Sequence, residues 1–269
     1  MMNNSFYGLS YNPFDKQTLK EVGSFQSKDH AQMISRLNYL KDIRGIGLFT
    51  AAPGMGKSYA LRCFEHSLNK NLYHMKYICL STISVTEFYR QFCDHLGIEA
   101  KGGKIAMFKA IQDRLYYLYK DKRQPLILAI DEAQYLSSAI LQDLKMLMNF
   151  SYDSLNCFSV VLSGESYLNR TLSKPVHEAL RQRITVHYAF QGLQPDEISA
   201  YIFHKLTMAG GAQSIMGEAA LAAITSYCQG NPRMIDNLMT DALVLGAQLQ
   251  RQVIDSEVIL AAVNEQTLG

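Results

Sequence analysis

The chain has 269 residues, of which 48% are hydrophobic and 19% charged, and its formal net charge is +2. This composition is typical of a globular protein and excludes a disordered chain, and the length suits one large domain or two unequal ones. No apolar run approaches the ~18–20 residues of a membrane-spanning helix, and the first residues lack the basic start and apolar core of a signal peptide. We therefore expect a cytoplasmic protein without a membrane partner, whose five scattered cysteines are buried and reduced.

The first two thirds of the chain alternate short apolar runs with helical patterns. The runs are mostly unbroken, as in the strands of a parallel sheet covered on both faces. Between them, residues 84–96 and 104–119 have helical spacing, with a capping box at Ser84 and Glu87 and an apolar arc that includes Ile105 and Phe108. This alternation predicts a three-layer α/β domain. The predicted strands are 45–50, 75–80, 125–130, 158–163 and 184–188.

From about Gly192 the pattern contains helices only. Pro195 suits the first turn of a helix, and further helices are expected near 217–228, 232–248 and 255–265. We therefore place an αβα domain at 1–192 and a small helical domain at 193–269.

The segment FTAAPGMGKSYAL, residues 49–61, predicts a phosphate-binding loop. It follows a strand and opens a helix at Lys57, which is the context that distinguishes the motif from an ordinary glycine-rich turn. Gly54 and Gly56 let the backbone approach phosphates, Lys57 would reach the β and γ phosphates, and the Ser58 hydroxyl would bind Mg²⁺. The usual first glycine is replaced by Ala51, which is costly only if φ there must be positive.

A second motif, PLILAIDEAQYL, ends an apolar strand in Asp131 and Glu132. Asp131 would hold Mg²⁺ through water, and Glu132 would orient the water that attacks the γ-phosphate. The alternative is a pair of acids at a helix start. The chain between the two motifs leaves room for a strand inserted between their strands. Positive charge near the γ-phosphate is available from Arg181, Arg183 and Arg233, although surface arginines are more often solvated than catalytic.

The order of these motifs resembles the AAA+ ATPases, and within them the ExeA/TnsC-like group, which includes ATPases that partner DDE transposases. The resemblance spans nearly the whole chain, and its more selective parts are FYGLSYNPF, LRQRITVHYAFQGLQPDEISAYI and GNPRMIDNL. It implies a three-layer αβα P-loop AAA+ domain with a mainly parallel five-stranded sheet, followed by a C-terminal all-helical lid. It also implies ATP and Mg²⁺ as cofactors.

The resemblance also implies residue roles. Arg181 or Arg183 would be the finger that reaches a neighbouring subunit's nucleotide, and Arg233 would read the γ-phosphate from the lid. Ser163, or Glu165 instead, falls at the polar sensor after the fourth strand. Nucleotide contacts are expected at Asn12, Pro13 and Phe14 beside the adenine, and along the loop at Pro53, Gly54, Met55, Gly56, Lys57, Ser58 and Tyr59.

The resemblance leaves two functions open. The first is a transposition regulator that assembles on double-stranded DNA in the ATP state as a ring or filament, recruits a DDE transposase and disassembles on hydrolysis. The second is an ExeA-like ATPase of secretion-system assembly, which we expect to need an anchor and a peptidoglycan-binding region that this sequence does not contain. Glu132 and the arginines argue against a third possibility, a module that only holds ATP.

A basic segment offers a candidate DNA surface. Residues 101–123 contain seven basic and two acidic residues, a local charge of 7 − 2 = +5. Such a surface would bind DNA mainly through phosphates, without strong sequence preference. We take Lys101, Lys104 and Lys109 as candidate contacts, and the alternative is a solvated helix face.

Overall fold

The computed structural model describes residues 4–18 and 23–267, and the chain divides into two compact units. One unit comprises Gln32–Pro53 and Lys57–Phe190, and the other comprises Met1–Ala31, Gly54–Gly56 and Gln191–Gly269. The chain therefore passes into the second unit close to Gly192, where the sequence places a boundary. The N-terminal segment groups with the helical unit, whereas the predicted division assigns it to the αβα domain.

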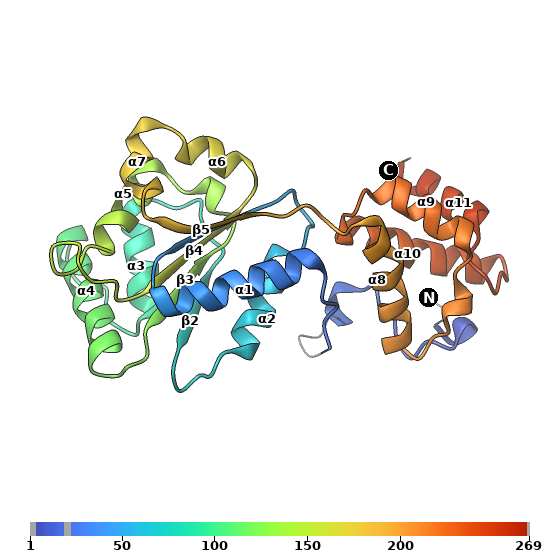
Figure 1. Ribbon diagram of the computed structural model, residues 1–269, viewed down its shortest axis with the longest axis horizontal. Helices are drawn as coiled ribbons and strands as arrows, with labels where there is room; N and C mark the ends of the chain where they lie inside the picture. Colours follow the sequence, from blue (N-terminus) through green and yellow to red (C-terminus); the bar gives the residue numbers. More distant parts are fainter. Residues whose placement is uncertain (1–3, 19–22, 268–269) are drawn as a thin grey trace. The chain divides into compact units, whose positions relative to one another are not determined.

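The αβα unit is built on a five-stranded parallel sheet (Figure 1). The order is β2-β3-β4-β1-β5, which confirms the predicted fold class and all five strands to within two residues. The inserted strand between the two motif strands is β4, which comes from later in the chain. The strands are β1 (Ile46–Thr50), β2 (His74–Ile78), β3 (Leu126–Ile130), β4 (Ser159–Gly164) and β5 (Ile184–Ala189).

Helices cover both faces of this sheet (Figure 1). On one face lie α1 (Lys28–Ile43) and α2 (Lys57–Ser67), and a Cβ on Gly47 would meet the Leu40 side chain of α1 at 2.7 Å. On the other lie α3 (Val85–His95), α4 (Lys104–Lys120) and α5 (Ser138–Leu147), packed on a large apolar core that includes Leu48, Leu128 and Val160. The strands have apolar residues on both faces because both faces are covered. The short helices α6 (Tyr167–Leu172) and α7 (Glu178–Arg181) precede β5.

The capping box that opens α3 is present as predicted, with both the Ser84 and the Glu87 side chain accepting the other residue's backbone N–H. The apolar arc of α4 differs from its prediction. Ile105 is 86% exposed, whereas Met107, Ile111 and Leu115 are buried. The buried face of α4 carries Met107, Ile111, Leu115 and Leu118 and meets α3, α5 and β3. Ile105 lies outside that face, at the edge of the predicted arc.

The second unit is helical. Its helices are α8 (Pro195–Met208), α9 (Glu218–Cys228), α10 (Pro232–Gln248) and α11 (Ser256–Thr267). Tyr7, Leu9 and Phe14 belong to their apolar core. The N-terminal segment therefore folds with these helices because its aromatic side chains find burial there. Single 3₁₀ turns lie at Asn4–Tyr7, Lys16–Thr18, Ala133–Tyr135, Pro175–His177 and Gln213–Ile215.

All five cysteines are free thiols. Four are buried, but Cys79 is exposed, contrary to the prediction, because it lies just beyond the end of the edge strand β2. No helix in the described part of the chain is long and apolar enough to cross a membrane.

Candidate functional site

The ends of several strands converge at the carboxylate of Asp131. Asp131 follows β3 and is 2% exposed. Its Oδ2 accepts hydrogen bonds from the Ser58 hydroxyl at 2.5 Å and the Tyr77 hydroxyl at 2.8 Å, and its Oδ1 accepts one from the Ser163 hydroxyl at 2.7 Å. These donors come from the start of α2, from β2 and from β4. Parallel strands bring such residues together because their carboxyl ends share one edge of the sheet.

The backbone of Asp131 is fixed as firmly as its side chain. Its N–H donates to the carbonyl of Ile78 at 2.8 Å, and its own carbonyl accepts from the Ser81 hydroxyl at 2.8 Å. Both partners lie at or just after the end of β2. The carboxylate is thus held in one orientation by a preorganised set of donors.

Glu132 lies next to this carboxylate and points away from the buried interior. It adopts a left-handed backbone with φ of 52°, which is unusual for a residue other than glycine and is common where strain serves function. Its Oε2 accepts a hydrogen bond from the Gln134 side-chain amide at 2.7 Å. An exposed carboxylate held by one amide is suited to orienting a water molecule.

The loop between β1 and α2 has the backbone that a phosphate cradle needs. Gly54 and Gly56 have φ of 85° and 91°, which glycine adopts without strain. A Cβ on Gly54 would also lie 2.6 Å from Oδ1 of Asn231, which belongs with Gly54 to the second unit. Lys57 is buried, and its ammonium donates to the carbonyls of Ala51 and Ala52 at 3.1 and 3.4 Å.

Ala51 fits its position because nothing there requires glycine. It is not among the described residues with positive φ, and its N–H donates to the carbonyl of Gly164 at 3.1 Å, which continues the β1–β4 pairing. The alanine at the usual first glycine is therefore compatible with an intact loop.

The two candidates for the polar sensor differ in their surroundings. Ser163 is fully buried and bonds to Asp131, whereas the Glu165 carboxylate is partly exposed and only its backbone N–H is held, by the Gln134 side chain at 3.0 Å. The structure thus brings Ser163, not Glu165, into direct contact with the central carboxylate.

The candidate finger arginines also differ. Arg181, at the end of α7, is exposed and donates to the carbonyl of Ser173 at 3.1 Å. Arg183, two residues on, is 18% exposed in its side chain and forms an ion pair with Asp153. Arg181 has the freer side chain of the two.

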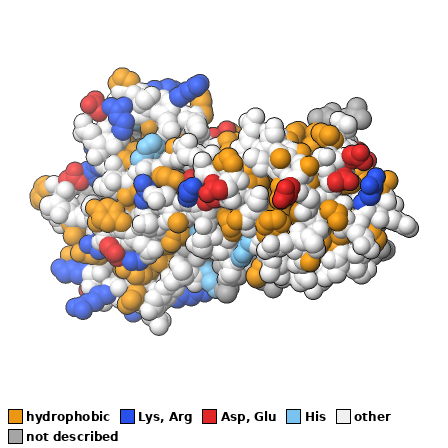
Figure 2. Space-filling model, turned by 45° about the vertical axis from the view of Figure 1, so that its right-hand side comes forward, with side chains coloured by type: hydrophobic (Ala, Val, Ile, Leu, Met, Phe, Trp, Pro, Cys, Tyr) orange, Lys and Arg blue, Asp and Glu red, His pale blue; other side chains and the backbone are white. Residues whose placement is uncertain are grey.

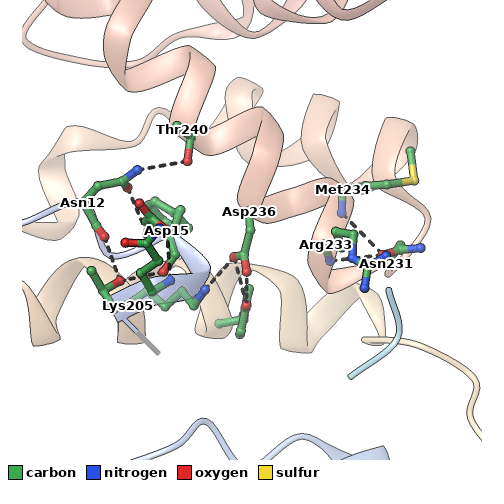
Figure 3. Close-up of polar contacts among 12 residues, drawn as sticks. Asn12, Asp15, Lys205, Asn231, Arg233, Met234, Asp236 and Thr240 are labelled. Carbon is green, nitrogen blue, oxygen red and sulfur yellow. Dashed lines mark hydrogen bonds and ion pairs between the residues drawn. The ribbon is translucent and has the colours of Figure 1, made fainter. Parts of the chain in front are cut away.

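Arg233 is the second residue of the helix α10 in the second unit, and its side chain is exposed. Its N–H lies 3.1 Å from Oδ1 of Asn231, which caps the helix (Figure 3). Asn12 bonds to the Thr240 hydroxyl on the same helix at 3.2 Å. Pro13 and Phe14 are buried within the helical unit, with the Phe14 ring beneath the Lys205 ammonium at 5.4 Å. Contact of this segment with adenine stays a prediction.

The three lysines considered for DNA binding are not equivalent. Lys101 pairs with Glu99 at 2.7 Å and Lys104 pairs with Asp143 at 2.6 Å. Lys109 is exposed, and no ion pair joins it to another residue in the described ranges. On the face drawn in Figure 2, basic side chains are interspersed with hydrophobic and acidic ones and form no continuous patch.

Besides Ser81, two residues of the site were missed by sequence reasoning. Tyr77 lies in the edge strand β2, and burial together with its hydrogen bond to Asp131 raises the pKa of its phenol. Gln134 holds both the Glu132 carboxylate and the Glu165 backbone. Gln134 lies two residues after the acid pair, which is the one signal that could have drawn attention to it.

Ser58 and Asp131 offer a hydroxyl and a carboxylate oxygen side by side, which is the ligand type that Mg²⁺ prefers. The loop, its lysine and the helix N-terminus offer what a polyphosphate needs. The site therefore fits a Mg²⁺–nucleotide complex.

Comparison with known proteins agrees with this chemistry. Residues 41–172 match the family described as "AAA domain". Just under half of the chain is therefore similar to an AAA-type P-loop ATPase domain. The matched range contains the loop, both acids and Ser163.

One curated relative is "General secretion pathway protein A" of Aeromonas hydrophila, which is 29% identical over 265 residues. The match covers 97% of this chain and 48% of that protein, so the chain spans about half the relative's length.

Solved structures share the fold of this chain at low sequence identity. Cdc6p of Pyrobaculum aerophilum has a TM-score of 0.69 at 17% identity, over 98% of this chain and 71% of that one. The ORC1 protein of Aeropyrum pernix, solved in complex with DNA, has a TM-score of 0.68 at 14% identity, over 94% and 68%. The RuvB branch migration motor of Thermotoga maritima has a TM-score of 0.59 at 15% identity, over 89% and 69%.

Proposed function

We propose that this chain is an ATP-driven assembly factor whose subunits associate in the ATP state and separate after hydrolysis. The observation that carries the proposal is the set of donors around Asp131, together with the Glu132 carboxylate held beside it by Gln134. A site that only stored nucleotide would not need a second, oriented carboxylate next to the first.

The loop residues Pro53 to Tyr59 would bind the phosphates, with Lys57 leaving the carbonyls of Ala51 and Ala52 for the β and γ phosphates. Ser58 and Asp131 would hold Mg²⁺, which neutralises charge on the phosphate oxygens when bound. Tyr77 and Ser163 would keep the Asp131 carboxylate in place.

Glu132 would accept a hydrogen bond from the attacking water and orient it towards the γ-phosphate. Arg181 suits the role of a finger donated to a neighbouring subunit, since Arg183 is already engaged by Asp153. Arg233 would contribute positive charge from the helical unit. Hydrolysis would remove the group that these arginines recognise, and association would weaken.

Secretion-system assembly is the better supported setting for this activity. The support is the relative "General secretion pathway protein A", whose match extends over nearly this whole chain. Because the chain spans about half of that protein, any further regions that a secretion role needs fall outside the part compared.

A transposition regulator that recruits a DDE transposase on double-stranded DNA is the second candidate. It rests on the motif resemblance and on the basic residues of 101–123, and the fold neighbours include an ORC1 structure in complex with DNA. Two of the three lysines proposed for DNA contact are already paired with acids, which weakens the support.

Sedimentation and electron microscopy of the Glu132→Gln variant test the proposal and separate its two settings. With ATP, the variant should form larger assemblies than with ADP, and Lys57→Ala should form none. Equal assembly with both nucleotides would contradict an ATP-driven association. Assembly that requires duplex DNA would favour the transposition setting, and assembly without DNA would favour the secretion setting.

A further inference from the structure

The αβα unit has a hollow of about 660 Å³ where β2 and β3 begin, at the edge of the sheet opposite to the one that carries Asp131. None of the residues assigned to nucleotide or Mg²⁺ lines it. It lies between the C-terminal ends of α1 and α4. Its lining comprises Asp42, Arg44, Leu72, Tyr73, Tyr116, Tyr119, Lys120, Arg123, Pro125 and Leu155.

The hollow is positively charged. It contains three cations, on Arg44, Lys120 and Arg123, and one carboxylate, on Asp42. Asp42 is already paired with the neighbouring Lys41 at 3.0 Å, so it offsets little of this charge. Arg123 is exposed and makes no hydrogen bond or ion pair with residues in the described ranges, which leaves its guanidinium available to a ligand.

Each tyrosine that lines the hollow has a cation over its ring. The Arg44 guanidinium lies 5.0 Å from the centre of Tyr119, and the Lys120 ammonium lies 5.4 Å from Tyr116, with which it also bonds at 2.9 Å. The Lys41 ammonium lies 5.2 Å from the centre of the Tyr73 ring. Such contacts hold the cations against the wall, so that less side-chain entropy is lost when an anion binds.

Two of the cations occupy backbone positions that ordinarily favour glycine. Arg44 and Arg123 both have φ of 55°. Arg44 follows the last turn of α1, with its N–H on the carbonyl of Leu40, and Arg123 closes α4 in a turn in which the N–H of Gln124 reaches the carbonyl of Leu118. Helices commonly end in a left-handed glycine at these positions, and another residue costs ~1–2 kcal/mol there. Glycine would close both helices without that cost. The presence of arginine at both positions therefore points to a function for the two side chains.

The hollow also has an apolar side, formed by Leu72, Pro125 and Leu155, and Leu72 is 52% exposed. The rim beside it is held by Gln124, whose side chain bonds to the Asn71 carbonyl at 2.7 Å and to the His74 ring at 3.0 Å. A ligand for this site therefore has anionic groups next to apolar ones.

We propose that this hollow is a docking site for an acidic peptide segment of a protein partner, in which carboxylate side chains alternate with apolar ones. Carboxylates would bind Arg123, Arg44 and Lys120, and guanidinium groups suit them because they donate in pairs. Apolar side chains would cover Leu72 and Pro125. A single-stranded nucleic acid fits less well, because base stacking needs open aromatic faces and cations cover one face of each of these rings.

Fluorescence anisotropy with the full chain tests the site. The probe is a short fluorescein-labelled peptide of alternating glutamate and leucine, and the same peptide with glutamine in place of glutamate is its neutral counterpart. The acidic peptide should bind more tightly than the neutral one. Arg123→Gly and Lys120→Gln should each raise its Kd about threefold to fivefold, and the double variant about tenfold. Lys109→Gln, on the same helix but outside the hollow, should leave the Kd unchanged.

Arg123→Gly removes the cation and relieves the cost of its left-handed backbone, so the variant should melt at or above the wild-type temperature and hydrolyse ATP at the wild-type rate. If that variant melts lower, Lys120→Gln alone still tests the site. Equal binding of the acidic and neutral peptides, or a double variant that binds like the wild type, would overturn the proposal. Binding of oligothymidylate that falls in the same variants, without peptide binding, would reassign the hollow to nucleic acid.

Discussion

The hydroxyl of Tyr77 donates a hydrogen bond of 2.8 Å to Oδ2 of Asp131 and thereby ties the edge strand β2 to the acid at the end of β3. The same oxygen accepts from Ser58, so the phenol and the serine share one carboxylate oxygen. This links a residue outside every recognised motif to the proposed Mg²⁺ site.

Tyr77→Phe removes that hydrogen bond and keeps the ring. Because Tyr77 is 40% exposed, water can partly replace the phenol, and we expect the free energy of Mg²⁺ binding to weaken by about 1 kcal/mol. This corresponds to a roughly fivefold higher Mg²⁺ concentration at half-maximal ATPase rate, with the melting temperature little changed. A magnesium titration of the ATPase rate measures the shift. Tyr39→Phe, at an exposed position of α1, is the matched control. An unshifted titration for Tyr77→Phe would show that the contact does not support Mg²⁺ binding.

Glu132→Gln should keep ATP binding and lower the hydrolysis rate about a hundredfold or more, because the amide cannot accept the water's proton as the carboxylate does. Gln134→Ala should lower kcat about tenfold and leave KM nearly unchanged, because it frees the Glu132 carboxylate that Gln134 holds at 2.7 Å. Steady-state kinetics and nucleotide binding separate the two effects, with Glu65→Gln on the exposed side of α2 as control. If Glu132→Gln hydrolysed ATP at the wild-type rate, Glu132 would not be the residue that orients the attacking water.

Arg181 and Arg183 should differ in which property their substitution alters. Arg183→Ala and Asp153→Asn each break the same ion pair, so both should destabilise the fold by about 1 kcal/mol and the double variant should lose no more. Arg181→Ala should leave the melting temperature unchanged. It should lower the ATPase activity of assembled subunits, because each finger acts on the nucleotide of a neighbouring subunit. Mixing Arg181→Ala with inactive Glu132→Gln subunits and finding no recovered activity would count against Arg181 as a finger.

The Lys205–Asp236 pair is a sensitive point of the helical unit. The two side chains are 2.6 Å apart and largely buried, and the Tyr201 hydroxyl also bonds to Asp236 (Figure 3). Burial lowers the pKa of Lys205 and raises the pKa of Asp236, with each partner opposing the shift of the other. Lys205→Met leaves an unpaired buried carboxylate and should cost about 3–5 kcal/mol near neutral pH, whereas a Lys205→Met/Asp236→Leu double variant should recover most of it.

The cost of Lys205→Met should depend on pH. Without the ammonium, the pKa of Asp236 rises further above its ordinary value of 3.8. A carboxyl with a raised folded pKa contributes stability that is fully present below its ordinary pKa and is lost as pH rises through the raised value. The deficit should therefore shrink as pH falls into the acidic range. Urea unfolding of variant and wild type at each pH measures it, and a deficit that is constant with pH would mean that Asp236 does not titrate as described.

Lys109 should dominate any DNA binding by the basic segment, because Lys101 and Lys104 are already paired with Glu99 and Asp143. Lys109→Glu should weaken duplex binding and reduce its salt dependence by about one counterion, while Lys101→Glu has less effect. Binding measured across a salt series gives both quantities. If all variants bound duplex DNA with equal affinity, the basic segment would be a solvated helix face and not a DNA contact.

The sequence by itself determined the sheet, the helices and most of the residues proposed for the nucleotide site. Unbroken apolar runs mark strands buried on both faces, and a glycine-bearing loop or an acid pair marks a strand end, because these signals are local in the chain. The same local chemistry identified Lys57, Ser58, Asp131 and Glu132. It did not place Ile105, because a helix's apolar arc can exceed the face that packing covers.

Tertiary structure decided what depends on residues far apart in sequence. Tyr77 joins the site only because β2 lies beside β3, and Ser163 meets Asp131 only because β4 lies between β3 and β1. Arg44 and Arg123 share one hollow because two helices end at the same edge of the sheet. Parallel pairing links strands through long connections, so the neighbours of each strand, and hence the side chains that meet at its ends, are set by packing across the whole unit.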